Sequence, residues 1–150
     1  MRMFYRFDSP LGQIAYDWNG QLCSRLELMA EDAAGPQSYG DDPVAQWLHA
    51  YFAGQATELP PLAKPATPFQ QKMRAGLLAI PFGEVRTYGQ LAGQLNTAPR
   101  AMGQALGANP LPILIPCHRV VAAGGLGGFG CGLAWKKKLL DFEYGFSAQH

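Results

Sequence analysis

Three prolines stand within residues 59–65, and this short segment divides the chain into two parts with different residue patterns. Proline fixes the backbone and cannot donate a hydrogen bond, so neither a helix nor a central strand continues through such a segment. Strand and turn patterns precede it, and apolar residues at helical spacing dominate after it. The segment therefore predicts two domains: residues 1–63, which include the linker, and residues 64–150.

The first part has the pattern of a small sheet with one helix. Two apolar stretches within residues 4–16 flank a Ser-Pro-Leu-Gly turn, and Asn19 with the glycine after it predicts a second hairpin that leads to a strand at residues 22–28. Asp42 and the proline after it predict the start of a helix, with apolar residues at helical spacing through residues 44–52. We expect an α/β fold here.

The second part predicts a series of helices, at about residues 68–80, 88–95, 98–107 and 133–144. Two of them are short and joined by a tight polar turn, an arrangement that resembles a helix-turn-helix. Helix pairs of this kind are also common in ordinary cores, so the motif alone does not decide for nucleic-acid binding.

Charge is divided unevenly between the two parts. Residues 1–67 hold four basic and eight acidic residues, whereas residues 68–150 hold eight basic and three acidic residues. Such asymmetry favours polyanion binding by the second part, although a chance distribution of solvated charge explains it equally well. The sequence has no stretch of eighteen apolar residues and no signal-peptide pattern, and its three cysteines are scattered. We therefore expect a cytoplasmic protein that does not bind membranes.

Cys117 is the strongest candidate nucleophile. It follows an apolar run at residues 111–115 and directly precedes His118. A thiol is only a few per cent ionised at neutral pH, so it needs a base, and an imidazole oriented by a carboxylate is the usual one. Asp141 and Glu143 offer that carboxylate. A Cys-His pair alone is more often a buried thiol beside an ordinary histidine, so the pair leaves both interpretations open.

The sequence around Cys117 resembles the signature of the O6-alkylguanine-DNA alkyltransferases. The run Ile-Pro-Cys-His-Arg-Val-Val occupies residues 115–121, and further segments follow the order and spacing of that family at residues 81–85, 87–92, 100–103, 109–110 and 139–143. The resemblance is close over residues 68–145 and loose over the first 67. It implies an α/β protein with a small N-terminal ribonuclease H-like sheet domain and a C-terminal winged-helix-like domain that contains the helix-turn-helix.

The same resemblance implies a function in direct DNA repair. The alkyl group of O6-alkylguanine in double-stranded DNA would pass irreversibly to Cys117, once per molecule, and O4-methylthymine would be a second substrate. A lesion inside a duplex cannot reach a protein nucleophile, so the nucleotide must be flipped out. The resemblance implies a monomer that needs no cofactor and no obligate protein partner.

Catalytic roles also follow from the resemblance. Cys117 would accept the alkyl group, and His118 would act as the base through a bound water, oriented by Glu143. Asn109 would brace the turn that presents the cysteine. Tyr88 would donate its hydroxyl to the purine as guanine leaves.

DNA-binding and substrate-binding residues are implied in the same way. Arg100 would enter the base stack, on a helix whose small residues allow close approach to the minor groove: Ala98, Pro99, Ala101 and Gly103. The glycine-rich loop would contact the lesion through Gly128, Phe129 and Gly130. Phe129 stands where the family usually has tyrosine, and Gly130 lacks a hydroxyl that some relatives use, which leaves the contacts to O6 open. Cys131 is either a packing residue or a second reactive thiol.

Other interpretations concern metal binding and two further classes of protein. Only Cys23 and His49 offer zinc ligands in the first part, without paired spacing, so we expect no metal. The lysines at 136–138 predict an exposed helix face. A lesion-binding protein without transfer activity is opposed by the presence of Cys117. A helix-turn-helix regulator is opposed by the small side chains of residues 98–107, which cannot read bases.

Overall fold

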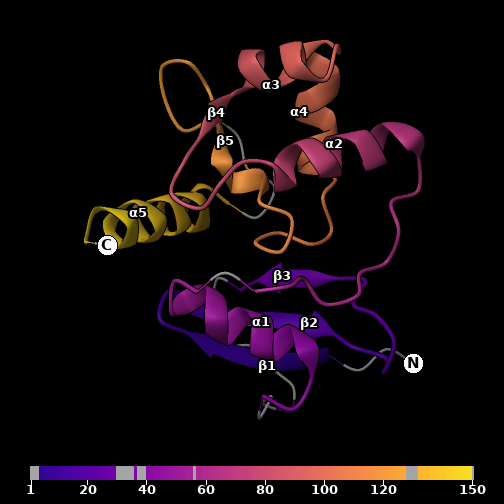
Figure 1. Cartoon of the computed structure of the whole chain (residues 1–150), viewed down its shortest axis with the longest axis vertical. Helices are drawn as coiled ribbons and strands as arrows, with labels where there is room; N and C mark the ends of the chain where they lie inside the picture. Colours follow the sequence, from indigo (N-terminus) through magenta and orange to yellow (C-terminus); the bar gives the residue numbers. More distant parts are fainter. Residues whose placement is uncertain (1–3, 30–35, 37–39, 56, 128–131, 150) are drawn as a thin grey trace. The chain divides into compact units, whose positions relative to one another are not determined.

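The computed structural model describes residues 4–29, 36, 40–55, 57–127 and 132–149. The chain is an α/β protein with small sheets and several helices (Figure 1). It separates into two compact units, Met1–Ala63 and Lys64–His150.

The unit Met1–Ala63 is built on a three-stranded antiparallel sheet. Strands β1 (Phe4–Ser9), β2 (Gly12–Asp17) and β3 (Leu26–Leu28) pair in sequence order. The hairpin predicted within residues 4–16 is confirmed. The inner positions of β2 are fully buried, which places the core of this unit against the middle strand.

The strand after the second turn is shorter than the sequence predicts. Residues 22–28 were expected to be extended throughout, but only β3 forms. The Asp17 carboxylate accepts hydrogen bonds from the backbone amides of Ser24 and Arg25 at 2.7 and 3.0 Å. Because a side chain occupies these amides, they are not available to a strand ladder.

Helix α1 (Pro43–Phe52) packs on this sheet. The Asp42 carboxylate accepts a backbone N–H of the first turn at 2.8 Å and the Tyr16 hydroxyl at 2.7 Å. One side chain therefore caps the helix, as predicted, and also ties it to β2. The rings of Phe7 and Phe52 stack with their centroids 6.2 Å apart, which adds an apolar contact between β1 and the end of the helix.

The unit Lys64–His150 contains the helices that the sequence predicts. They are α2 (Pro68–Leu78), α3 (Tyr88–Gln94), α4 (Pro99–Gly107) and α5 (Leu133–Gln149). Threonines cap α2 and α3, and the second of these caps is completed by a glutamine three residues on. Across the described part of the chain, none of the helices combines the length and the apolar character that crossing a membrane requires.

Helix α5 extends five residues past its predicted end near Tyr144. Its last turns carry Phe142 and Phe146, whose rings each meet the Phe82 ring edge-on with centroids 6.1 Å apart. These aromatic contacts are made to a segment sixty residues away in the chain, so a local sequence pattern does not reveal them.

A buried turn leads into the segment at residues 115–121 that contains Cys117. Ile113 has a φ of 71°, a left-handed conformation that is unusual for a β-branched residue, and the amide of Ile115 donates to the carbonyl of Leu111 at 2.9 Å. The short helix η1 (Cys117–Arg119) follows. Strand β5 (Val120–Val121) then pairs in parallel with β4 (Arg86–Thr87). The buried residues around Ile113 hold its left-handed turn in place.

Candidate active site

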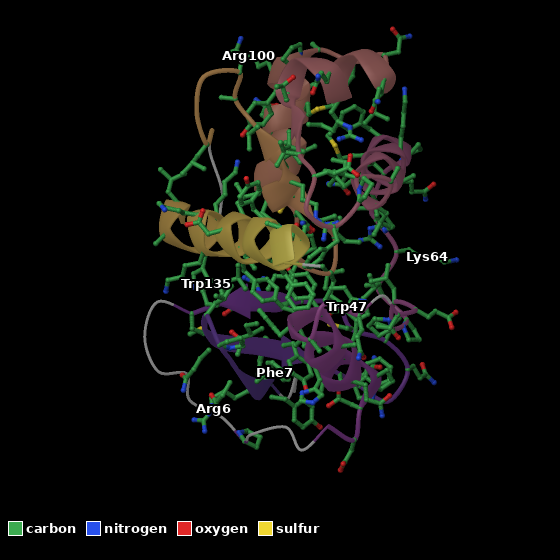
Figure 2. The ribbon with its side chains drawn as sticks, turned by 60° about the vertical axis from the view of Figure 1, so that its left-hand side comes forward. Arg6, Phe7, Trp47, Lys64, Arg100 and Trp135 are labelled. Carbon is green, nitrogen blue, oxygen red and sulfur yellow. The ribbon has the colours of Figure 1, made fainter. Side chains whose placement is uncertain are left out.

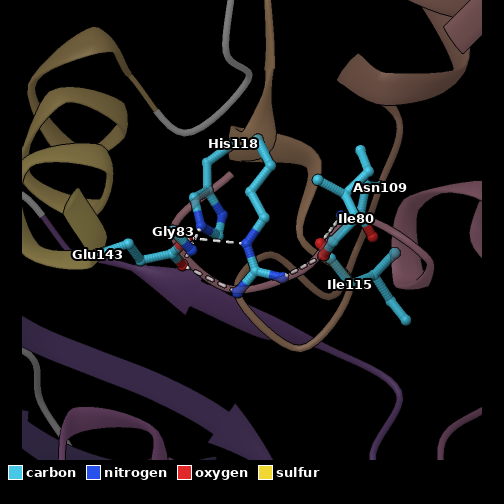
Figure 3. A network of polar contacts seen from close by, with 7 residues as sticks. Ile80, Gly83, Asn109, Ile115, His118 and Glu143 are labelled. Carbon is cyan, nitrogen blue, oxygen red and sulfur yellow. Dashed lines mark hydrogen bonds and ion pairs between the residues drawn. The ribbon is translucent and has the colours of Figure 1, made fainter. Parts of the chain in front are cut away.

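Cys117 begins η1, and its side chain is held by a neighbouring amide. The Nδ2 group of Asn109 donates to the Cys117 Sγ atom at 3.1 Å and to the carbonyl of Ile115 at 3.0 Å. The Asn109 Oδ1 atom accepts the amide of Leu111 at 3.0 Å. Asn109 therefore joins both sides of the buried turn to the sulfur, and Figure 3 shows its side chain directed at Ile115.

His118 is fully buried and fixed by a carboxylate from α5. Its Nε2 atom lies 2.7 Å from Glu143 Oε2. An ionised carboxylate only accepts hydrogen bonds, so the imidazole donates through Nε2 and keeps Nδ1 as an acceptor. Within the described residues, Nδ1 has no hydrogen-bond partner. Burial lowers the pKa of His118, which favours the neutral imidazole.

The Glu143 carboxylate receives further donors. Arg119 reaches Oε1 through Nε at 2.8 Å and Oε2 through Nη2 at 3.0 Å, and the backbone amide of Gly83 lies 3.3 Å from Oε1 (Figure 3). Burial by itself would raise the pKa of Glu143, but the hydrogen bonds of His118 and Arg119 and the positive charge of Arg119 lower it to about 2. The carboxylate is therefore an anion at any pH near neutrality.

Arg119 is a site residue for which the sequence pattern predicts no role. Besides its contacts with Glu143, its Nη1 atom donates to the carbonyl of Ile80 at 2.8 Å, and its guanidinium lies 5.7 Å from the centroid of the Phe82 ring. The signal in the sequence was an arginine inside a run of apolar residues, where a charge needs a buried partner. The partner is 24 positions away, so the sequence alone did not identify it.

Lys137 and Lys138 are exposed, as predicted, but Lys136 departs from the predicted exposed lysine face. Its side chain is fully buried, and its Nζ atom donates to the carbonyl of Val120 at 2.7 Å. The ammonium also lies 5.8 Å from the centroid of the Tyr88 ring. Burial lowers the pKa of Lys136, and attraction to Cys117 opposes that effect. Helical spacing was the signal in the sequence that could have indicated this burial. Lys136 stands seven residues before Glu143, which places the two on the same face of α5.

The two carboxylates that the sequence offered have different environments. Asp141 is exposed and pairs on the helix surface with Lys137, with 2.8 Å between Oδ2 and Nζ. Glu143 is the carboxylate that meets His118. The helix therefore divides its charged residues between a solvent-facing side and the side that contacts η1.

Tyr88 is the first residue of α3 and contacts the glycine-rich segment. Gly127 has a φ of 74°, and a Cβ atom built there would lie only 2.6 Å from the Tyr88 Oη atom. This position therefore requires glycine, both for its backbone conformation and for the space that the tyrosine occupies. Of the predicted loop residues, Gly128, Phe129, Gly130 and Cys131 lie outside the described residues.

Helix α4 presents its predicted DNA-contacting residues to solvent. Met102 is fully buried. The five predicted residues around it are all exposed: Ala98, Pro99, Arg100, Ala101 and Gly103. Figure 2 shows Arg100 at the outer edge of its unit, away from Trp135 on α5. In the ranges that the structure describes, no group of three or more His, Cys, Asp or Glu side chains could hold a metal ion.

Comparison with known proteins identifies the family of this chain. Residues 68–145 match the family described as 6-O-methylguanine DNA methyltransferase, DNA binding domain. The methylated-DNA–protein-cysteine methyltransferase of Mycobacterium bovis is 39% identical over 146 residues, which cover 91% of this chain and 88% of the relative. This chain belongs to the methylated-DNA–protein-cysteine methyltransferase family.

Solved structures of this methyltransferase family share the fold of the whole chain. The crystal structure of Mycobacterium tuberculosis O6-methylguanine methyltransferase has a TM-score of 0.80 at 36% identity, and the match covers 97% of this chain and 94% of that one. A crystal structure of the Mycobacterium tuberculosis protein in complex with DNA has a TM-score of 0.79, with 95% and 93% coverage. The match to these two structures thus extends over both units.

Proposed function

We propose that this chain repairs O6-alkylguanine in double-stranded DNA by transferring the alkyl group irreversibly to Cys117. The observation that carries the proposal is a buried thiol beside a histidine whose Nε2 atom is fixed on Glu143 at 2.7 Å. Family membership supports the reaction class, and the relative in complex with DNA supports the partner. O4-methylthymine would be repaired by the same displacement.

The chemistry requires one proton transfer and one displacement. The Cys117 proton leaves Sγ through a bound water for His118 Nδ1, the acceptor that faces no other partner among the described residues. The sulfur electron pair then attacks the alkyl carbon and the bond from that carbon to O6 breaks. The guanine left in the DNA takes up a proton in place of the one that Cys117 gave up, and His118 returns that proton to the solvent, so the balance closes. The Asn109 amide, 3.1 Å from Sγ, holds the nucleophile in place.

Tyr88 and the glycine-rich loop would bind the flipped base. We propose that the Tyr88 hydroxyl donates to the purine as guanine gains negative charge, and that Gly128, Phe129 and Gly130 line the remaining side. Because a thioether does not hydrolyse, each molecule would act once. The family resemblance further implies that the chain acts as a monomer.

Helix α4 would enter the minor groove of the DNA. Its exposed residues are small apart from Arg100 and Gln104, so the helix backbone can approach the duplex with little reading of its sequence. Arg100 would fill the space that the flipped nucleotide leaves. In this proposal Lys64–His150 is a winged-helix-like DNA-binding and acceptor domain, and Met1–Ala63 is a ribonuclease H-like lobe.

Intact-mass measurement followed by peptide mapping tests the proposal directly. After incubation with duplex DNA that contains one O6-methylguanine, the protein should gain one methyl group on Cys117 and the DNA should regain guanine. Cys117→Ala should bind the lesion without gaining mass. Unchanged wild-type mass together with lesion-selective binding would instead indicate a sensor protein, and transfer that persists in Cys117→Ala would move the acceptor to Cys131.

A further inference from the structure

Arg119 and His118 bind the same carboxylate. The Arg119 Nε and Nη2 atoms lie 2.8 and 3.0 Å from the two oxygens of Glu143, and His118 Nε2 lies 2.7 Å from one of them. All three side chains are buried. One carboxylate carries a single negative charge, so a permanent cation and a titratable imidazole share it.

This sharing decides which protonation state His118 adopts. A buried carboxylate alone favours a protonated imidazole, because the ion pair stabilises the cation. Here Arg119 already balances the charge of Glu143. A proton added to His118 would leave a net positive charge in a buried place, which is unfavourable. The neutral imidazole still donates to the carboxylate through Nε2 and keeps Nδ1 as an acceptor.

We propose that Arg119 is a positioning residue for alkyl transfer: by neutralising Glu143 it keeps His118 neutral, with Nδ1 ready to take the proton of Cys117. This inference rests on the proposed transfer to Cys117. In the proton step, the S–H bond breaks and an Nδ1–H bond forms, so a thiolate and an imidazolium replace two neutral groups. Arg119 and Glu143 keep their charges throughout.

Contacts outside the carboxylate hold Arg119 in place. Its Nη1 atom donates to the carbonyl of Ile80 at 2.8 Å, and its guanidinium lies over the Phe82 ring. These contacts come from the segment that follows α2, whereas Glu143 comes from α5. The guanidinium therefore does not depend on His118 for its position, and it stays in place when the imidazole gains a proton.

The other charged groups that face His118 act in defined directions. Burial is the largest influence and lowers the pKa of His118, Glu143 raises it, and Arg119 and Lys136 lower it. Lys136 comes from α5 and donates to the carbonyl of Val120, not to Glu143. Cys117 is the titratable neighbour from η1. Arg119 is thus the cation that acts on His118 through their common partner.

Nitrogen-15 NMR of the histidine-labelled full chain tests the inference without any lesion DNA. His118 should be neutral at pH 7, with the proton on Nε2, and should stay neutral below the pH at which an ordinary histidine titrates. A protonated His118 at pH 7, or a neutral one with its proton on Nδ1, would overturn the inference. This measurement does not require Cys117 to accept an alkyl group.

Two variants and a matched control separate charge from structure. Arg119→Met should raise the pH of half-protonation of His118 by about one to two units, and Arg119→Lys, which keeps the charge, should raise it less. Leu77→Ala removes a buried side chain of the same unit without changing any charge, and should leave the titration of His118 unmoved. No shift in Arg119→Met would overturn the proposal. If Arg119→Met does not fold, the wild-type spectrum and Arg119→Lys still decide.

Transfer kinetics supply the second readout. In Arg119→Met the acid limb of the pH–rate profile should move to higher pH by the same amount as the His118 titration, which lowers the rate on that limb about tenfold per unit. A titration shift with an unmoved acid limb would overturn the role of Arg119 in transfer. If Cys117 accepts no alkyl group while His118 titrates as expected, the proposed function fails. The inference that Arg119 keeps His118 neutral would still stand.

Discussion

Helices α4 and α5 lie in the same unit and present opposite kinds of surface. The inner face of α5 buries Lys136 and Glu143, each with hydrogen-bond partners, whereas α4 exposes Arg100 among small residues and buries Met102. Charges that act on a reacting thiol must be oriented in advance in a place with little water. A helix that meets DNA of any sequence needs an accessible backbone instead. In the proposed function, chemistry and DNA contact would therefore use different elements of the same unit.

Replacement of Glu143 by glutamine disrupts the buried face of α5 most severely. The neutral amide would leave Arg119 as a buried cation without its anion and would no longer fix the tautomer of His118. We expect the transfer rate to fall by about 10³- to 10⁴-fold, by analogy with the orienting carboxylates of other nucleophile–histidine sites. The free energy of unfolding should fall by about 3–5 kcal/mol. Single-turnover kinetics and urea unfolding measure the two effects.

Asp141→Asn is the matched control on the exposed face of the same helix. Its pair with Lys137 is solvated, with both side chains 67% exposed, so the variant should keep both its transfer rate and its stability. An unchanged pH–rate profile in Glu143→Gln would show that Glu143 takes no part in the proton relay.

The buried carboxylate of Glu143 should also make the free energy of unfolding depend on pH. The pKa of Glu143 in the folded chain is about 2, below its ordinary value of 4.5, so the stabilisation is complete above pH 4.5 and is lost as the pH falls toward 2, by about 3 kcal/mol in total. The lowered pKa of His118 acts in the same direction from pH 6.5 downward, because the unfolded chain takes up a proton that the folded chain does not. Urea titrations between pH 7 and 3 should show this loss in the wild type and a smaller one in Glu143→Gln.

Most helices could be predicted from the sequence because their start signals are local. The caps at Asp42, Thr67 and Thr87 lie within three residues of the amides that they bind. Two features of the fold differ from the prediction, and both depend on distant or side-chain partners. The strand at 22–28 is shortened by a carboxylate, and α5 is lengthened by aromatic contacts with Phe82.

The site was predicted unevenly for the same reason. Cys117 and His118 are adjacent, so their chemistry is visible in the sequence, and the resemblance supplied Glu143. Arg119 and Lys136 were missed because their importance comes from burial and from partners 24 and 16 positions away. A charged residue inside an apolar run, or on the inner face of a helix, is the signal that sequence reasoning should weigh more heavily.

Arg100→Ala tests the exposed helix α4. Without the side chain that fills the vacated stack, flipping of the nucleotide becomes less favourable, and repair of duplex DNA should slow by about 10- to 100-fold. Reaction with the free O6-methylguanine base, which needs no flipping, should change little. Gln104→Ala, also exposed on α4, is the control and should affect both substrates weakly. Equal losses of Arg100→Ala on duplex and free base would rule out a role in flipping.

Lys136→Met and Lys137→Met compare a buried with an exposed lysine one position apart on α5. The buried ammonium attracts Cys117 when the thiol is ionised, so its removal should make the thiolate form only at higher pH and slow transfer at neutral pH by about tenfold. The exposed Lys137 forms a solvated pair, and its removal should leave the pH–rate profile unmoved. Single-turnover rates from pH 6 to 9 distinguish the two. Equal pH–rate profiles for both variants would mean that buried Lys136 only anchors α5 through its hydrogen bond to the carbonyl of Val120. The division of charge between the two faces of α5 would then concern folding and not the reaction.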